Sequence, residues 1–168
     1  MLVVKTNHLL VFILSLGLLG CSSKYTLDRS VEPVKPNSAN HEIQLRKNLT
    51  GKWYGEQPTK SGAVKWVNNR LNDGTYVIKS IIENYDGSVK KNIEFGNWGI
   101  SGSIYFTIFR GKIKNQKAIF YADPSDVYNY DAYKIISVDN LTMHYRHVAY
   151  DNEYIVKKMK PDFELFKQ

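Results

Sequence analysis

Beyond residue 49 the chain consists of short runs in which apolar and polar positions alternate, and turn signals separate the runs. Alternation with a period of two is typical of β-strands that bury one face. Residues 72–74 (Asn-Asp-Gly) and 86–87 (Asp-Gly) are strong hairpin signals, because glycine accepts the positive φ of tight turns. Weaker signals stand at residues 139–140 and 151–152. The pattern predicts eight strands, at residues 51–57, 64–72, 75–85, 88–96, 102–110, 130–138, 141–150 and 153–160.

The connections between these strands are short, with one exception at residues 111–129. Short connections predict that strands adjacent in sequence pair antiparallel. Eight such strands without a crossover helix can remove their exposed edges by closing into a barrel, and an open sandwich is the competing arrangement. The sequence therefore predicts an all-β fold, an eight-stranded antiparallel up-and-down barrel. The long connection is expected to be a lid, a binding segment or a disordered excursion.

The first 40 residues have a different pattern. Lys5 is followed by an apolar run at residues 9–19, which is typical of a secretory signal and shorter than the roughly 20 residues of a membrane-spanning helix. Residues 22–40 are polar and include two prolines, so a flexible tether is expected there, followed by a helical turn at residues 41–48. The predicted organisation is a signal peptide at 1–20, a lipidated N-terminus and tether at 21–40, and a barrel domain at 41–168.

The tetrad Leu18-Leu19-Gly20-Cys21 resembles the lipobox of bacterial lipoproteins. The resemblance implies cleavage before Cys21 and attachment of lipid, including palmitate, to this cysteine. Ser22 in the next position resembles the pattern of lipoproteins that are passed on to the outer membrane, which implies an anchor there and a domain that faces the periplasm. Cys21 is the one cysteine of the chain, so no intrachain disulfide and no catalytic thiol are expected.

Basic residues outnumber acidic ones, 23 Lys and Arg to 16 Asp and Glu, and the formal net charge is +7. Such a balance favours anionic surfaces as partners. The basic residues are scattered, however, and adjacent pairs occur at residues 46–47, 90–91 and 157–158 with no longer run. This distribution is typical of a solvated surface, and for an exported protein we expect no nucleic-acid partner.

At the start of the first predicted strand, Gly51-Lys52-Trp53 resembles the Gly-x-Trp signature of lipocalins. The resemblance extends over about residues 49–159, and small bacterial envelope lipoproteins with lipocalin-like barrels are the nearest group. It implies that Trp53, with Gly51, closes one end of the barrel, and that Lys157 or Lys158 packs across the tryptophan. It also implies a protein that binds a small apolar or amphipathic ligand without chemistry.

In such a barrel the end where Trp53 lies is closed, and alternate connections lie at the same end. The turns at residues 73–74, 97–101 and 139–140 are then expected at the closed end. The connections at residues 58–63, 86–87, 111–129 and 151–152 are expected at the open mouth.

Alternation also predicts which side chains share a face. Both faces of the strand at 102–110 are largely apolar or aromatic, and one of them is expected to face the cavity. Guanidinium groups at the end of an apolar cavity would suit an acyl chain with an anionic head. The competing interpretation is that the aromatic residues are core and the arginines are solvated. The predicted ligand-binding residues are Trp66, Arg70, Phe106, Ile108, Arg110 and Tyr145.

The sequence contains no motif of an enzyme, a cofactor site or a metal site. Gly-x-Ser-x-Gly, His-Glu-x-x-His and phosphate-binding glycine loops do not occur. His144 and His147 are three residues apart and point to opposite faces of a strand, so they cannot hold one metal ion. We therefore expect a non-enzymatic protein without cofactor. The alternative function is a module that binds or inhibits an envelope protein through the 111–129 segment, with Phe120, Tyr121 and Tyr128 as the contact residues.

Overall fold

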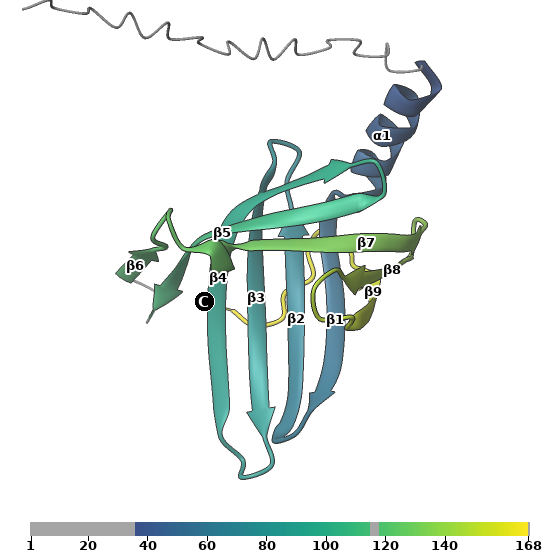
Figure 1. Cartoon of the computed structure of the whole chain (residues 1–168). Coiled ribbons are helices and arrows are strands. Elements are labelled where there is room, and N and C mark those ends of the chain that lie inside the picture. The colour runs from purple at the N-terminus through teal and green to yellow at the C-terminus, as the bar shows by residue number, and fades with distance from the viewer. Residues whose placement is uncertain (1–35, 115–117, 168) are drawn as a thin grey trace, which may run out of the picture. The chain divides into compact units, whose positions relative to one another are not determined.

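The computed structural model describes residues 36–114 and 118–167, which belong to one compact unit spanning Val34–Gln168. Figure 1 shows the strands wrapped around a common interior, with one helix at one end. The elements are α1 (Pro36–Leu49), β1 (Gly51–Thr59), β2 (Gly62–Arg70), β3 (Thr75–Asn84), β4 (Val89–Ser101), β5 (Ile104–Lys114), β6 (Ala118–Tyr121), the 3-10 helix η1 (Val127–Asn129), β7 (Tyr130–Val138), β8 (Thr142–His147) and β9 (Glu153–Lys158).

Eight of the strands close into a ring. Each strand pairs antiparallel with the next in the order β1, β2, β3, β4, β5, β7, β8 and β9. The pairs Trp53↔Lys158 and Tyr54↔Lys157 then join β9 back to β1. The predicted eight-stranded antiparallel up-and-down barrel is confirmed, and the open sandwich is excluded.

The long connection at residues 111–129 is only partly a loop. β5 continues to Lys114, and its last residues pair with β6 from Gly111↔Tyr121 to Lys114↔Ala118. Its first residues, 104–108, pair with β7 instead. β6 is therefore a short strand outside the ring, and it projects from the barrel near the mouth (Figure 1).

The turn predicted at residues 97–101 is wrong, because β4 continues to Ser101 and the chain turns at residues 102–103. Gly96 and Gly99 serve close packing here rather than a turn. A Cβ on Gly96 would lie 2.1 Å from the carbonyl oxygen of Ile108, and a Cβ on Gly99 would lie 2.4 Å from the Phe106 ring. Both distances are far below van der Waals contact. At Gly96 the neighbour is backbone, so this position requires glycine, whereas at Gly99 the neighbour is the end of a side chain that can move.

α1 covers the end of the barrel at which β1 begins. Leu45 and Leu49 on this helix are buried in the same core cluster as Trp53. Gly51, with a φ of 102°, begins β1 one residue after the end of the helix. The helix starts at Pro36 and is longer than the helical turn expected at residues 41–48. The predicted signal peptide and Cys21 lie outside the described residues, so the division at residues 1–20 and 21–40 stays a prediction.

Trp53 is fully buried at this closed end, with an exposure of 0%. Its indole Nε1 donates a hydrogen bond to the carbonyl oxygen of Leu49 at 2.9 Å. The Lys158 ammonium lies 4.5 Å from the centroid of the Trp53 ring and donates to the carbonyl oxygens of Asn48 and Thr50. Burial lowers the pKa of Lys158, and the nearby Arg70 lowers it further. The end of the barrel is thus closed by a tryptophan with a lysine packed across it.

The residues after β9 pack along the outer face of β1–β3. Glu164 forms ion pairs with Lys52 at 2.9 Å and with Lys79 at 2.5 Å. The hydrogen bonds from Lys79 and Lys52 lower the pKa of Glu164 to about 2. Phe163 packs edge-on against Tyr54, with ring centroids 6.2 Å apart. The C-terminal segment therefore covers apolar and basic side chains that these strands turn outward.

Candidate ligand cavity at the open end of the barrel

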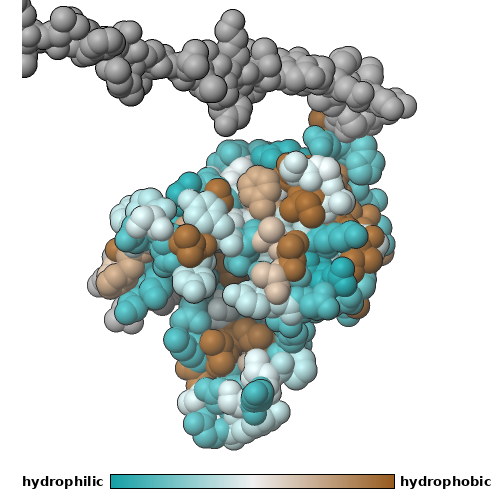
Figure 2. All heavy atoms as spheres, in the orientation of Figure 1, coloured by the Kyte–Doolittle hydropathy of each residue, from teal (hydrophilic) through white to brown (hydrophobic). Residues whose placement is uncertain are grey.

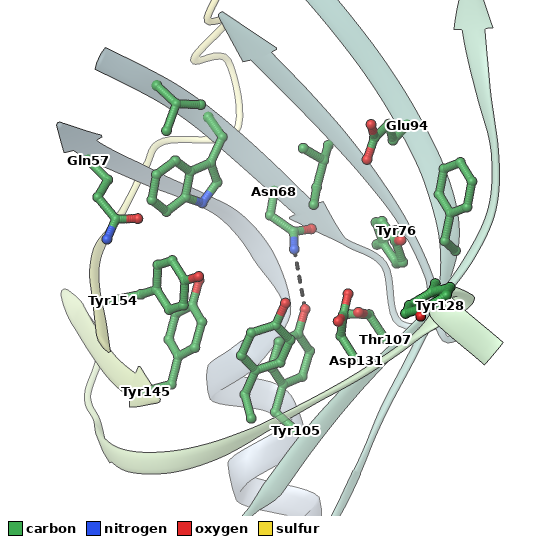
Figure 3. Close-up of a pocket in the computed structure, with 15 residues that line it drawn as sticks. Gln57, Asn68, Tyr76, Glu94, Tyr105, Thr107, Tyr128, Asp131, Tyr145 and Tyr154 are labelled. Atoms are coloured by element: carbon green, nitrogen blue, oxygen red, sulfur yellow. Dashed lines mark hydrogen bonds between the residues drawn. The ribbon is translucent and has the colours of Figure 1, made fainter. Parts of the chain in front are cut away.

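The barrel interior holds a cavity of about 500 Å³ between the closed-end core and the mouth. Each of the eight ring strands contributes at least one inward-facing side chain to its wall (Figure 3), and η1 contributes one more. Most of the lining side chains are aromatic, and Val64 and Ile78 are the aliphatic members. The lining residues are Gln57, Val64, Trp66, Asn68, Tyr76, Ile78, Glu94, Tyr105, Thr107, Phe109, Tyr128, Asp131, Tyr133, Tyr145 and Tyr154.

Tyrosines form the inner part of this wall as two stacked pairs. The rings of Tyr105 and Tyr133 stack at 5.4 Å, and those of Tyr145 and Tyr154 stack at 5.2 Å. The pairs meet edge-to-face, since Tyr133 and Tyr145 lie 5.3 Å apart at 86°. Trp66 extends the wall with an edge contact to Tyr154 at 6.0 Å. Such interlocked rings offer flat apolar faces and hydroxyl edges in a fixed arrangement.

Three of the cavity tyrosines have hydroxyl groups that burial holds in the protonated form. Burial raises the pKa of Tyr76, Tyr133 and Tyr145 above the ordinary value of 10. For Tyr145 the charge of Arg70 counteracts part of this effect. Each of these phenols therefore carries a proton that it can donate to a ligand.

The two carboxylates of the cavity wall, Glu94 and Asp131, lie on one side of the cavity. In Figure 3, Glu94, Tyr76, Thr107 and Asp131 lie opposite Tyr145, Tyr154 and Gln57. Burial raises the pKa of Glu94, while Lys112 and Lys90 act in the opposite direction.

Asp131 and Asn68 have partners within the barrel. The ring Nε2 of His147 lies 3.1 Å from the Asp131 carboxylate. Asn68 donates a hydrogen bond to the Tyr105 hydroxyl at 3.3 Å, and its own carbonyl oxygen is buried without a partner. Asn68 thus retains one hydrogen-bonding group for a ligand at the inner end of the cavity.

The structure divides the predicted ligand-binding residues into two groups. Trp66 and Tyr145 line the cavity, and Arg70 is buried directly beneath it against the Tyr105 ring. The other three, Phe106, Ile108 and Arg110, share the opposite face of β5.

This placement corrects the choice of face on β5. Tyr105, Thr107 and Phe109 point inward, so the alternate residues Phe106 and Ile108 point outward. The register between β4 and β5 shifts by one residue at Arg110. The Nε of the Arg110 guanidinium donates a hydrogen bond to the Asn97 side chain at 2.9 Å. Because both faces of this strand are apolar, composition could not distinguish them.

Sequence reasoning missed the tyrosine wall, which includes Tyr105, Tyr133 and Tyr154. The signal that was available was the number of tyrosines, 12 in the chain, and the presence of at least one in each of the last four predicted strands. Cross-strand neighbours such as Tyr105↔Tyr133 and Tyr145↔Tyr154 appear only once the register is known.

The two histidines of β8 lie on opposite faces of the strand. His144 lies on the outer face beside Glu153, at 2.9 Å, whereas His147 points inward to Asp131. Within residues 36–114 and 118–167, no three His, Cys, Asp or Glu side chains are grouped so as to hold a metal ion.

Comparison with known proteins gives distant structural likenesses. No family model matches the sequence, and no curated protein matches it significantly. The crystal structure of a lipocalin-like protein from Bacteroides uniformis is similar, with 16% identity and a TM-score of 0.40, over 67% of this chain and 99% of that one. That of an uncharacterized protein from Bacteroides eggerthii is similar with 12% identity and a TM-score of 0.39, over 66% and 98% of the two chains.

None of the helices in the described part of the chain combines the length and the apolar composition that crossing a bilayer requires.

Proposed function

We propose that this protein binds a small, ring-bearing amphipathic molecule in the open end of its barrel, without chemical conversion. The observation that supports this most directly is the wall of Trp66 and stacked tyrosines around a cavity of about 500 Å³. That volume lies in the range of small-molecule sites, about 300–1,000 Å³. Flat rings pack well against aromatic faces, and the hydroxyl edges then bind polar substituents.

The lining favours a ring over the acyl chain expected from the sequence. A flexible hydrocarbon chain needs long aliphatic walls, and this cavity has two aliphatic side chains, Val64 and Ile78. Gln57, Asn68 and Thr107 add polar groups along its length. A rigid ligand with polar substituents would use these groups, whereas an acyl chain would leave them unpaired.

A fluorescence titration with phenylnaphthylamine, a neutral probe with two aromatic groups, tests the proposed function. The chain from Ser22 onward keeps every described residue, and we expect it to bind one probe molecule. Trp66→Ala removes one aromatic side chain from the cavity wall and is expected to weaken binding of the probe about tenfold. Phe106→Ala removes an aromatic ring from the outer face of β5 and serves as the matched control with unchanged affinity. Absence of saturable binding, or equal losses in the two variants, would contradict the proposal.

We also propose that the protein is an exported lipoprotein, anchored through Cys21 in the outer membrane and facing the periplasm. The signal-like pattern of residues 1–20 and the lipobox-like tetrad support this. Metabolic labelling with palmitate is expected to label the full chain, and Cys21→Ser is expected to abolish both the label and sedimentation with membranes, because stable anchoring needs attached acyl chains. Membrane sedimentation of the unlabelled serine variant would refute the anchor.

A second candidate function is docking to an envelope protein through β6 and η1. Large apolar side chains are exposed there, among them Phe120 at 46%, Tyr121 at 77% and Tyr128 at 83%. On the face shown in Figure 2, hydrophobic residues are interspersed with hydrophilic ones. This function would be favoured if the probe did not bind and Tyr121→Ser abolished crosslinking to an envelope protein in cells.

A further inference from the structure

Beneath the cavity lies a buried guanidinium group. Arg70 is the last residue of β2 and shares its inner face with Trp66 and Asn68, which line the cavity. Its exposure is 1%, and its guanidinium lies 4.4 Å from the centroid of the Tyr105 ring. Tyr105 and Tyr145, which form the floor of the cavity, therefore lie directly beside a positive charge.

The charge of Arg70 is not balanced by the protein. Its Nε and Nη1 atoms are buried and have no hydrogen-bond partner, and no carboxylate of the described segments lies within ion-pair distance. Arg70 also lowers the pKa of Lys158, which is a second cation nearby. Burial of an unpaired cation is costly, so a fold keeps one only where something else compensates it.

The carboxylates of the cavity wall have positive or hydrogen-bonding neighbours of their own. Glu94 lies near Lys112 and Lys90, and Asp131 contacts His147. At the floor, by contrast, the positive charge of Arg70 lies beside the side chains of Tyr105 and Tyr145, whose hydroxyl groups can donate hydrogen bonds. The inner end of the cavity therefore complements a negative group that can accept hydrogen bonds.

We propose that the floor of the cavity binds the anionic end of the ligand, an oxyanion such as a carboxylate or a sulfonate, with Arg70 as its counter-charge. This inference rests on the proposed function and specifies its ligand: an aromatic or other ring-bearing molecule that enters with its acidic group first. The rings of the ligand then lie against Trp66 and the tyrosines, and its other end lies at the mouth.

Two fluorescent probes with the same two aromatic groups test this inference. Anilinonaphthalene sulfonate carries an anionic group, and phenylnaphthylamine does not. We expect the chain from Ser22 to bind the sulfonate at least tenfold more tightly than the neutral probe, the effect of one hydrogen-bonded charge. Arg70→Met is expected to remove this preference, so that the sulfonate binds no more tightly than the neutral probe does. Arg110→Met removes the same charge from the outer face and should keep the preference.

Asn68→Asp provides a second test that leaves Arg70 in place. The new carboxylate is nearly isosteric with the amide and would pair with Arg70, so the preference for the sulfonate should again be lost.

If the neutral probe binds and the sulfonate binds no better, the inference fails and the proposed function stands. If neither probe binds, the proposed function itself fails. A preference that persists in Arg70→Met, together with a lower urea midpoint, would overturn the inference and give Arg70 a structural role.

Discussion

Replacing Trp53 with alanine is expected to lower the free energy of unfolding by about 4 kcal/mol, within the range for large aromatic side chains in a core. The side chain is fully buried, so its removal leaves a cavity in the cluster that joins α1 to the barrel. The substitution also removes the hydrogen bond to Leu49 and the ring beneath Lys158. Because a domain of this size is stable by about 5–15 kcal/mol, much of its stability should be lost.

Urea denaturation followed by circular dichroism measures this loss. Trp66→Ala is the matched control, because Trp66 is a half-buried tryptophan of the same barrel that faces the cavity. It should shift the midpoint much less than Trp53→Ala does. Equal shifts in the two variants would mean that the closed end contributes no special stability to the fold.

Replacing Gly96 with alanine is expected to destabilise the protein by about 3 kcal/mol, at the upper end of overpacking effects. The new Cβ would lie 2.1 Å from the carbonyl oxygen of Ile108 and 2.7 Å from the Tyr76 ring. The first neighbour is backbone of the paired strand β5, so relief requires separation of two hydrogen-bonded strands. Tyr76 lines the cavity, and its displacement should also weaken binding of the neutral probe.

Gly99→Ala on the same strand is the control for this prediction. Its Cβ would meet the ring of Phe106, which is 36% exposed and can rotate away. We expect the urea midpoint of Gly99→Ala to stay close to that of the unmodified chain. A similarly small shift in Gly96→Ala would show that β4 and β5 can separate at little cost.

The fold could be predicted because its determinants are local. Alternation and the turn signals at residues 72–74 and 86–87 define the strands, and short connections leave few ways to pair them. The same local rules failed around Gly96 and Gly99, where they predicted a turn. These glycines allow β5 to pack closely against β4, and the neighbouring residues in sequence do not reveal this packing. The short strand β6 was missed because it pairs with the extension of β5 and takes no part in the ring.

The cavity could be predicted only in part, because its wall depends on register. Trp66 and Tyr145 were recognised from alternation within their own strands. The face of β5 was chosen incorrectly because Phe106 and Phe109 are equally apolar, and only pairing with β7 places Tyr105 beside Tyr133. The unpaired charge of Arg70 is likewise a property of the assembled barrel, since no neighbour in sequence reveals what lies around a buried side chain.

Chain order has a further consequence for how ligands would reach the protein. The polypeptide enters the barrel through α1, at the end that Trp53 closes, and the cavity opens at the opposite end. Whatever precedes Pro36 therefore joins the barrel at its closed end, and a ligand would enter the cavity at the end opposite that junction.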